Sequence, residues 1–253
     1  MKVFYFTTTG NSLYVAKRIG GELYSIPHMI KEGKHEFEDD VIGFIFPCYV
    51  FGLPKLVKDF VKKTKFKANY FFAVMTYGHK AESGLYHMEK VGGEAGIKFS
   101  YTNEILMVDN YLPAFKIEDE LKKEGSKKIE EKLNKIINDI STRQNKYIRK
   151  SIKSVILSKS FSSLAGRFSY NFGRNNFIVL DNCTSCKVCE KVCPVNNISI
   201  SKKPEFSNKC EMCHACIHHC PQNAIHLKNE KSKVRFINRN VKLKEIIDAN
   251  NQK

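Results

Sequence analysis

Two copies of one cysteine pattern, C-x2-C-x2-C-x3-C-P, occupy residues 183–194 and 210–221 and constrain this chain more than any other feature. The copies are offset by 27 residues, and together they contain eight of the nine cysteines. We expect no signal peptide at the start of the sequence, so this density of cysteines predicts metal ligation rather than disulfide bonds. A short apolar segment follows each copy, which predicts an internally repeated unit with pseudo-twofold symmetry.

The spacing of the cysteines predicts which of them share a metal centre. Three cysteines within seven residues wrap one corner of an iron–sulfur cubane, and the fourth lies too far away to reach the same cluster. We therefore expect two 4Fe-4S clusters, each completed by a cysteine from the other copy, and electron transfer as the work of this unit. The first cluster would bind Cys183, Cys186, Cys189 and Cys220, and the second Cys210, Cys213, Cys216 and Cys193.

Zinc is the alternative metal, because Zn2+ also binds four cysteines. Structural zinc sites, however, usually pair two separate C-x2-C knuckles. His214, His218 and His219 lie inside the second copy and are alternative ligands. Since eight cysteines are present, we expect these histidines to lie beside a cluster or at the surface, where their positive charge would raise a cluster potential.

The first 145 residues alternate between strand-like and helix-like patterns. Strands are expected at 2–6, 41–46, 69–76 and 100–108, and helices at 12–23, 53–63, 85–94 and 129–140. This alternation is typical of a parallel sheet with helices on both faces. The expected fold class is α/β, with a doubly wound parallel sheet, joined to a small α+β unit.

A polar loop separates the first expected strand from the first expected helix. It consists of Thr7, Thr8, Thr9, Gly10, Asn11 and Ser12. Backbone N–H groups and the helix dipole favour an anion at this position. The hydroxyls of Thr7, Thr9 and Ser12 would surround a phosphate, whereas the alternative interpretation is an ordinary capping turn.

The loop resembles the S/T-x-T-G-x-S/T phosphate loop of flavodoxins, which binds the phosphate of FMN. This resemblance implies that Thr7, Thr9, Gly10, Asn11 and Ser12 bind FMN. Two further strand ends lie where ligands of an open α/β sheet bind, and they contain Pro47, Tyr49 and Gly52, and Thr76, Tyr77 and Gly78. Tyr49 and Tyr77 are expected to stack on the isoalloxazine ring, although loop tyrosines also occur as plain surface residues.

Together these motifs resemble a family of flavodoxin–ferredoxin fusion proteins of anaerobic bacteria, and the likeness covers nearly the whole chain. The resemblance implies a flavodoxin-like five-stranded sheet that binds FMN, followed by a bacterial-type ferredoxin domain with two 4Fe-4S clusters. The segment 109–113 also looks like part of that family's pattern, and would either line the flavin edge or form a simple turn. The chain departs from flavodoxins in having no tryptophan and in being strongly basic.

Four segments are expected along the chain: an FMN-binding domain at 1–145, a basic connector at 146–175, a two-cluster domain at 176–232 and a C-terminal tail at 233–253. Residues 141–180 contain no acidic side chain and eight Lys or Arg residues. Such a basic amphipathic segment would contact anionic lipid at the membrane periphery or an acidic partner, or would pack between the domains with its charges in water.

The formal net charge of +16 makes an acidic redox protein, a ferredoxin or an oxidoreductase, the expected partner. No nucleic-acid recognition motif is present, and no apolar run is long enough to span a membrane, so we expect a cytoplasmic protein. The sequence does not indicate the oligomeric state.

Three functions stay open at this point. The chain would be an electron carrier between FMN, the clusters and a partner protein, because a flavin exchanges one or two electrons and a cluster exchanges one. It would alternatively be a flavoenzyme that reduces a small acceptor such as a quinone or nitro compound. The third alternative is a ferredoxin with a flavin-free docking domain, so whether the chain is a carrier or a flavin-dependent oxidoreductase is left undecided.

Overall fold

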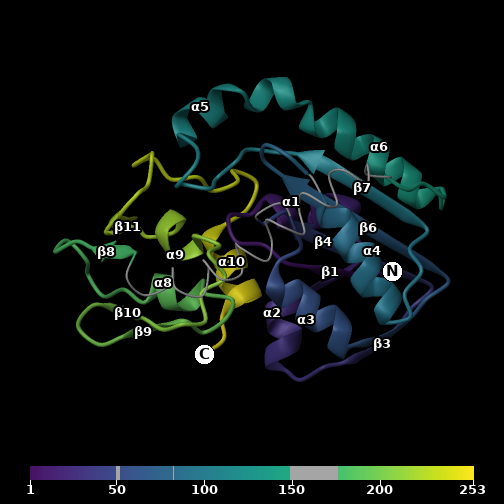
Figure 1. Ribbon diagram of the computed structural model, residues 1–253, viewed down its shortest axis with the longest axis horizontal. Helices are drawn as coiled ribbons and strands as arrows, with labels where there is room; N and C mark the ends of the chain where they lie inside the picture. Colours follow the sequence, from purple (N-terminus) through teal and green to yellow (C-terminus); the bar gives the residue numbers. More distant parts are fainter. Residues whose placement is uncertain (50–51, 82, 149–175) are drawn as a thin grey trace.

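The computed structural model describes residues 1–49, 52–81, 83–148 and 176–253. Most of the expected basic connector lies outside the described residues, and so do the lipid and partner contacts predicted for it. Within the described ranges, no helix is both long and apolar enough to cross a membrane. Figure 1 shows a helix-covered sheet beside a smaller unit that contains the cysteine repeat.

Five parallel strands form the larger unit. Their order across the sheet is β2 (Glu22–Ser25), β1 (Lys2–Tyr5), β4 (Val41–Pro47), β6 (Tyr70–Tyr77) and β7 (Tyr101–Leu106). The chain leaves β1 to one side to form β2 and to the other side to form the remaining strands, which creates a switch point between β1 and β4. Ligands of such sheets bind at this point, outside the carboxyl ends of the strands. The expected α/β class and doubly wound parallel sheet are confirmed.

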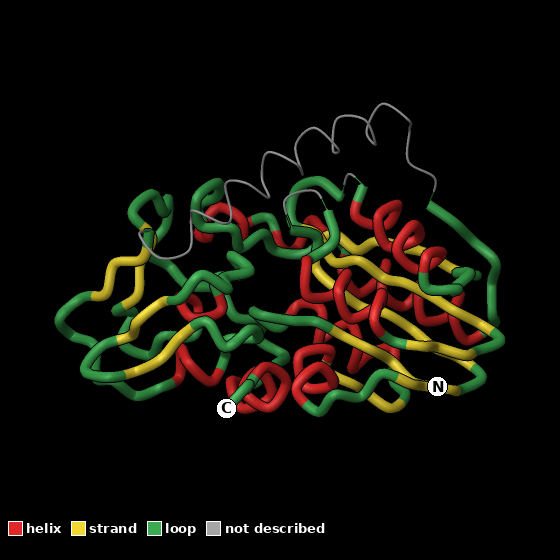
Figure 2. The backbone as a smooth tube through the Cα atoms, turned by 60° about the horizontal axis from the view of Figure 1, so that its bottom comes forward, coloured by secondary structure: helices red, strands yellow, loops and turns green. Residues whose placement is uncertain are grey.

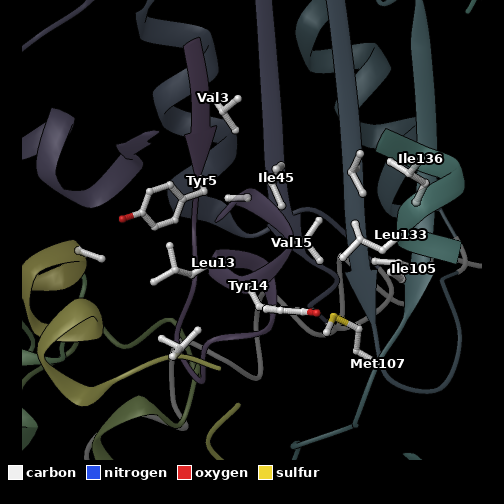
Figure 3. Packing of buried hydrophobic residues seen from close by; sticks show 14 of the residues in the cluster. Val3, Tyr5, Leu13, Tyr14, Val15, Ile45, Ile105, Met107, Leu133 and Ile136 are labelled. Carbon is white, nitrogen blue, oxygen red and sulfur yellow. The ribbon is translucent and has the colours of Figure 1, made fainter. Parts of the chain in front are cut away.

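Helices cover both faces of the sheet, because side chains alternate between the two faces along each strand. One face packs against α1 (Asn11–Ile19) and α6 (Ile129–Ser141), and the other against α2 (Ile26–Lys31), α3 (Lys55–Lys63) and α4 (Gly84–Glu94). Figure 3 shows Leu13 and Val15 of α1 packed against the first face. The opposite face is rich in phenylalanine, including Phe4 and Phe44, whose ring centroids lie 5.7 Å apart.

The helix expected at 12–23 is wrong at its end, because residues 22–25 form strand β2. Helix α1 ends at Ile19, because Gly20 and Gly21 adopt φ values of 83° and 90°, which stop the helix and turn the chain. Leu23, interpreted as the last apolar residue of the helix, instead pairs with Val3 across two parallel strands. The apolar spacing of Leu23 fits both structures, so the glycine pair was the stronger signal.

Short elements complete the larger unit. Strands β3 (Glu36–Glu38) and β5 (Lys65–Lys67) form a small parallel pair. Helix α5 (Ile117–Lys122) and the 3-10 helix η1 (Glu124–Lys127) connect β7 to α6. Figure 2, a second view of the backbone, shows this unit as a layer of strands flanked by helices.

The smaller unit repeats one motif twice. Strand β8 (Phe177–Val179) pairs with β11 (Ile225–Leu227), and β9 (Ile198–Ile200) pairs with β10 (Pro204–Phe206), both antiparallel. One short helix lies within each cysteine pattern, α8 (Val188–Lys191) in the first and α9 (Ala215–His218) in the second. The short apolar segments that follow the two patterns form β9 and β11.

The segment after residue 232, expected as a tail, packs against the larger unit. It contains helix α10 (Leu243–Asn250), which the sequence analysis did not predict. Helix α10 contacts both α2 and α8 and lies between the two units in Figure 1. Ser25 Oγ donates a hydrogen bond to Ala249 O, and Asn250 Nδ2 donates one to Thr7 O at 2.9 Å. The segment therefore joins the cysteine unit to the first strands of the sheet.

We predict that Gly43→Ala destabilises the sheet. A Cβ at Gly43, in the middle of β4, would meet the Phe72 ring at 2.0 Å, and overpacking of this kind costs about 1–3 kcal/mol. Thermal unfolding followed by circular dichroism under argon should show a lower midpoint. Gly93→Ala is the matched control, because a Cβ at Gly93 meets nothing within 4 Å, so its midpoint should stay unchanged or rise. An unchanged midpoint for Gly43→Ala would contradict the tight packing of β4 on β6.

Candidate functional site

A cavity of about 350 Å3 lies at the carboxyl ends of β1, β4, β6 and β7. Tyr5 pairs with Ile45, and Pro47 pairs with Thr76, so the loops that follow these strands begin at a common edge of the sheet. The cavity lining includes most of the residues predicted to bind FMN: Thr7, Thr9, Asn11, Ser12, Pro47, Tyr49, Thr76, Tyr77 and Gly78. The structure therefore brings together three segments that the sequence analysis selected separately.

Gly10 and Gly52 are predicted site residues that do not line the cavity. Gly10 precedes α1 with a φ of 100°, and a Cβ there would lie 3.0 Å from the Cβ of Asn238. Gly52 exchanges two backbone hydrogen bonds with Tyr49, of 3.0 and 2.8 Å. The structure therefore gives both glycines a part in backbone conformation or close packing.

The loop before α1 has the donors that an anion requires. Helix α1 has no side-chain cap and no acidic residue in its first turn, so its N-terminal N–H groups face the loop without a local carboxylate. The Thr7 side chain is buried, and its Oγ1 has no hydrogen-bond partner among the described residues. A buried hydroxyl without a partner is destabilising, and a phosphate oxygen would supply the missing acceptor. Ser12 Oγ lies 2.9 Å from Thr76 Oγ1, which ties this loop to the end of β6.

The two predicted stacking tyrosines differ in their surroundings. Tyr49 packs its ring against the edge of Phe6 at 5.9 Å, and its hydroxyl lies 3.1 Å from Thr8 Oγ1. Burial raises the pKa of the Tyr49 hydroxyl well above its usual value, so the side chain is neutral. Tyr77 is partly exposed at the end of β6 and also lines the cavity. Both tyrosines are placed to contact a bound ligand.

The segment that follows β7, left open as flavin edge or turn, lies at the cavity. The Asp109 side chain covers Gly78, where a Cβ would meet Asp109 Oδ2 at 2.3 Å. Asn110 Nδ2 donates a hydrogen bond to Thr9 Oγ1 at 2.8 Å. Tyr111 lies parallel to the ring of His214, with centroids 5.3 Å apart and an interplanar angle of 10°. This segment therefore connects the polar loop to the second cysteine pattern.

The remaining wall of the cavity comes from the cysteine unit. Glu211, Met212, Cys213 and His214 line the same cavity as the polar loop before α1. This wall was not predicted from the sequence. Contacts between segments about 200 residues apart leave no local pattern in a single sequence, and only the tertiary fold places these four residues over the strand ends.

The eight patterned cysteines gather in two sets. Cys183, Cys186, Cys189 and Cys220 line one small cavity, and Cys193, Cys210, Cys213 and Cys216 line another. Each set combines three cysteines of one copy with the fourth cysteine of the other, which is the grouping expected from the spacing. Within the described part of the chain, no group of three or more His, Cys, Asp or Glu side chains converges as a single metal ion needs. A cubane binds one thiolate at each iron, so its four ligands stand further apart.

Both cysteine loops are shaped to hold thiolates. Backbone N–H groups donate to sulfur at Cys193 from Asn197 (3.2 Å), at Cys220 from Ala224 (3.2 Å) and at Cys210 from Met212 (3.3 Å). Non-glycine residues with positive φ recur at the 27-residue offset of the repeat, at Ser185 and Met212, Lys187 and His214, and Asn196 and Asn223. Burial raises the pKa of the Cys189 thiol to about 12 and that of Cys210 to about 11. Thiolates at these buried positions therefore need a bound cation, which iron supplies.

Burial favours the neutral form of the histidines in the second copy over the positive charge expected from the sequence. The Phe236 N–H donates to His218 Nδ1 at 3.1 Å, so the ring is neutral with its proton on Nε2, 2.9 Å from Asn110 O. His219 Nε2 lies 2.8 Å from Thr8 O. Burial lowers the pKa of His214 to about 4 and that of His218 to about 3. These side chains are neutral groups that fasten the cysteine unit to the cavity loops.

Comparison with known proteins agrees with the cysteine geometry. Residues 177–199 match the model of the 4Fe-4S binding domain family. Among solved structures, the Trp repressor binding protein from Bacillus subtilis is similar at 14% identity over 42% of this chain and 82% of that chain, with a TM-score of 0.31. No curated protein matches the chain.

The family match covers the three closely spaced cysteines of the first copy together with Cys193. These four residues belong to the two cysteine sets that line the small cavities. The chain therefore contains a 4Fe-4S ferredoxin domain, which indicates iron–sulfur electron transfer.

Proposed function

We propose that the protein transfers electrons between an FMN in the large cavity and two 4Fe-4S clusters in the cysteine unit, and passes them to or from an acidic redox protein. The observation that carries this proposal is the shared wall. Cys213 belongs to the second cysteine set and also lines the cavity at the strand ends. A ligand to one redox centre thus forms part of the binding site for the other.

The residues around the cavity fit FMN. The strand order is the flavodoxin-like one, in which FMN binds at the switch point. The cavity volume lies within the range of roughly 300–1,000 Å3 typical of small-molecule sites. Thr7, Thr9 and Ser12 would hold the phosphate beside the N-terminus of α1, with Thr7 Oγ1 as a donor that lacks a partner in the described part of the chain. Tyr49 and Tyr77 would contact the ring.

Bound FMN would exchange one or two electrons, whereas each cluster would exchange one. The first cysteine set would hold the cluster away from the cavity, because its members do not contribute to the cavity lining. Cys186 of that set is exposed. The second set therefore serves as the connection to the cavity, and the first set serves as the connection to the surface.

The partner follows from charge. The formal net charge is +16, and the protein stays positively charged after two clusters and a flavin phosphate are added. An acidic protein would therefore be attracted, over a distance that the ionic strength sets.

The unpartnered Thr7 hydroxyl and the preformed cavity support a flavin-binding domain over a flavin-free docking domain.

Metal content provides the first test of this proposal. Protein purified without oxygen should contain about eight irons and eight sulfides per chain, and one FMN after reconstitution. Cys186→Ala and Cys210→Ala should each retain about four irons, because each removes a ligand from a different set. Electron transfer from photoreduced FMN to iron should persist in Cys186→Ala and slow strongly in Cys210→Ala. Bound zinc in place of iron would contradict the assignment of two iron–sulfur clusters. So would the loss of all iron from Cys186→Ala while Cys210→Ala keeps its iron.

Thr7→Val tests the phosphate site. Valine has nearly the same shape and removes a hydroxyl that has no partner, so FMN-free protein should unfold at the same temperature or slightly higher. The dissociation constant for FMN should rise about tenfold, because a hydrogen bond to a charged phosphate is lost. Quenching of flavin fluorescence measures it.

Riboflavin, which has no phosphate, should bind Thr7→Val as it binds the wild type. Thr64→Val is the matched control: Thr64 is equally buried but lies outside the cavity, 3.3 Å from His35 Nδ1. It should leave the affinity for FMN unchanged. If Thr7→Val weakened FMN and riboflavin by the same factor, the assignment of Thr7 to the phosphate would be wrong.

A further inference from the structure

The backbone of the polar loop before α1 is held by the C-terminal part of the chain. Three consecutive carbonyls of the loop each accept a hydrogen bond: Thr7 O from Asn250 Nδ2 (2.9 Å), Thr8 O from His219 Nε2 (2.8 Å) and Thr9 O from the backbone N–H of Asn238 (2.8 Å). Each donor lies more than 200 residues after its acceptor in the sequence. Three separate segments therefore converge on one short loop.

These hydrogen bonds fix the direction of the peptide groups in the loop. The peptide bonds are trans, so the C=O of one residue and the N–H of the next point in opposite directions. The three carbonyls point at donors that do not line the large cavity, whereas the threonines themselves do line it. The N–H groups of Thr8, Thr9 and Gly10 are consequently turned away from the C-terminal donors.

The N–H groups of Thr8, Thr9 and Gly10 donate to no other group within the described part of the chain. The loop is nevertheless buried, with Thr8 only 5% and Thr9 only 3% exposed. A buried N–H group without an acceptor is destabilising, and several such groups in a row form a concave site for an anion. The loop thus has the donors of a phosphate site, and their direction depends on bonds made behind it.

Close packing holds the same loop in place. A Cβ at Gly10 would lie 3.0 Å from the Cβ of Asn238 and 3.1 Å from the Cβ of Val241, so only a glycine lets the two backbones approach this closely. Asn238 Nδ2 donates to Asn11 Oδ1 at 3.1 Å, and Asn11 Nδ2 donates to Val108 O at 3.2 Å. The start of α1 is therefore fixed between the C-terminal segment and the segment that follows β7.

We propose that Asn250, His219 and Asn238 are positioning residues for the phosphate group of the cavity ligand. By holding three carbonyls away from the cavity, they keep the N–H groups of the loop directed at a phosphate ester. This assignment rests on the proposed function, since it concerns the phosphate end of the same cavity. The phosphate site is thus completed by residues outside the segment 1–145, which was expected to bind FMN by itself.

Three variants of two donors and one matched control test this assignment. Asn250→Leu keeps the size of the side chain and removes the donor to Thr7 O. His219→Phe removes the second side-chain donor, whereas His219→Gln keeps an N–H group at a similar distance from the backbone. Gln252→Leu is the control, because Gln252 Nε2 donates to Pro27 O at 3.0 Å, outside the loop.

Inorganic phosphate provides a measurement that needs no flavin. In cluster-loaded, FMN-free protein, phosphate should slow hydrogen exchange in the peptide that contains residues 7–12, as followed by mass spectrometry. Asn250→Leu and His219→Phe should each need about ten times more phosphate for the same protection, because the N–H groups are no longer held in the binding direction. His219→Gln and Gln252→Leu should behave like the wild type.

The affinities for FMN and riboflavin give the second measurement. The dissociation constant for FMN should rise about tenfold in Asn250→Leu and in His219→Phe, while that for riboflavin, which has no phosphate, stays unchanged. A purely structural part for these side chains would lower the unfolding midpoint but leave the ratio of the two affinities as in the wild type. An unchanged ratio in both variants would therefore overturn the proposal.

The two measurements also separate this proposal from the proposed function. If phosphate protected the loop with the expected pattern while the wild type bound neither flavin, the positioning of the anion would stand and the assignment of FMN would fail. If phosphate protected the wild type and all variants at the same concentration, or left the wild type unprotected, the positioning would be wrong even in a protein that binds FMN.

Discussion

The structure depends on the contact between the second cysteine loop and the carboxyl edge of the parallel sheet. Hydrogen bonds from His219 to Thr8 and from His218 to Asn110 hold this contact, and both partner residues lie in loops that follow strands of the sheet. Because the histidines are buried and neutral, they fasten the loop without introducing an uncompensated charge. The cavity wall that Glu211, Met212, Cys213 and His214 form depends on this interface.

Much of the fold was predictable from local sequence patterns. The apolar runs that form β1, β4 and β6 have the composition of buried parallel strands, and residues 129–140 show the apolar periodicity of the helix that forms α6. The grouping of the cysteines into two sets follows from spacing alone, since three ligands within one short turn cannot surround a cubane. The polar loop before α1 was identified because its position between a strand and a helix has a physical meaning.

Other features could not be predicted, because they depend on contacts between distant segments. Strand β2 is short and partly exposed, so its side chains lack the apolar run of a central strand. Helix α10 buries Ile246 and Ala249 only because α2 and α8 are present to cover them. The cavity wall at Glu211 likewise depends on distant segments. So does the hydrogen bond from Asn110 Nδ2 to Thr9 Oγ1, which forms only in the folded protein. The charge of the histidines depends equally on burial.

The return of α10 to the first strands has a consequence for biosynthesis. Thr7 and Ser25 emerge early from the ribosome, but their partners Asn250 and Ala249 emerge more than 200 residues later. The face of the sheet that α10 covers therefore stays incompletely covered until residues 243–250 have been synthesised. Both cysteine loops precede α10 in the sequence, so the sheet is closed only after both loops have been made.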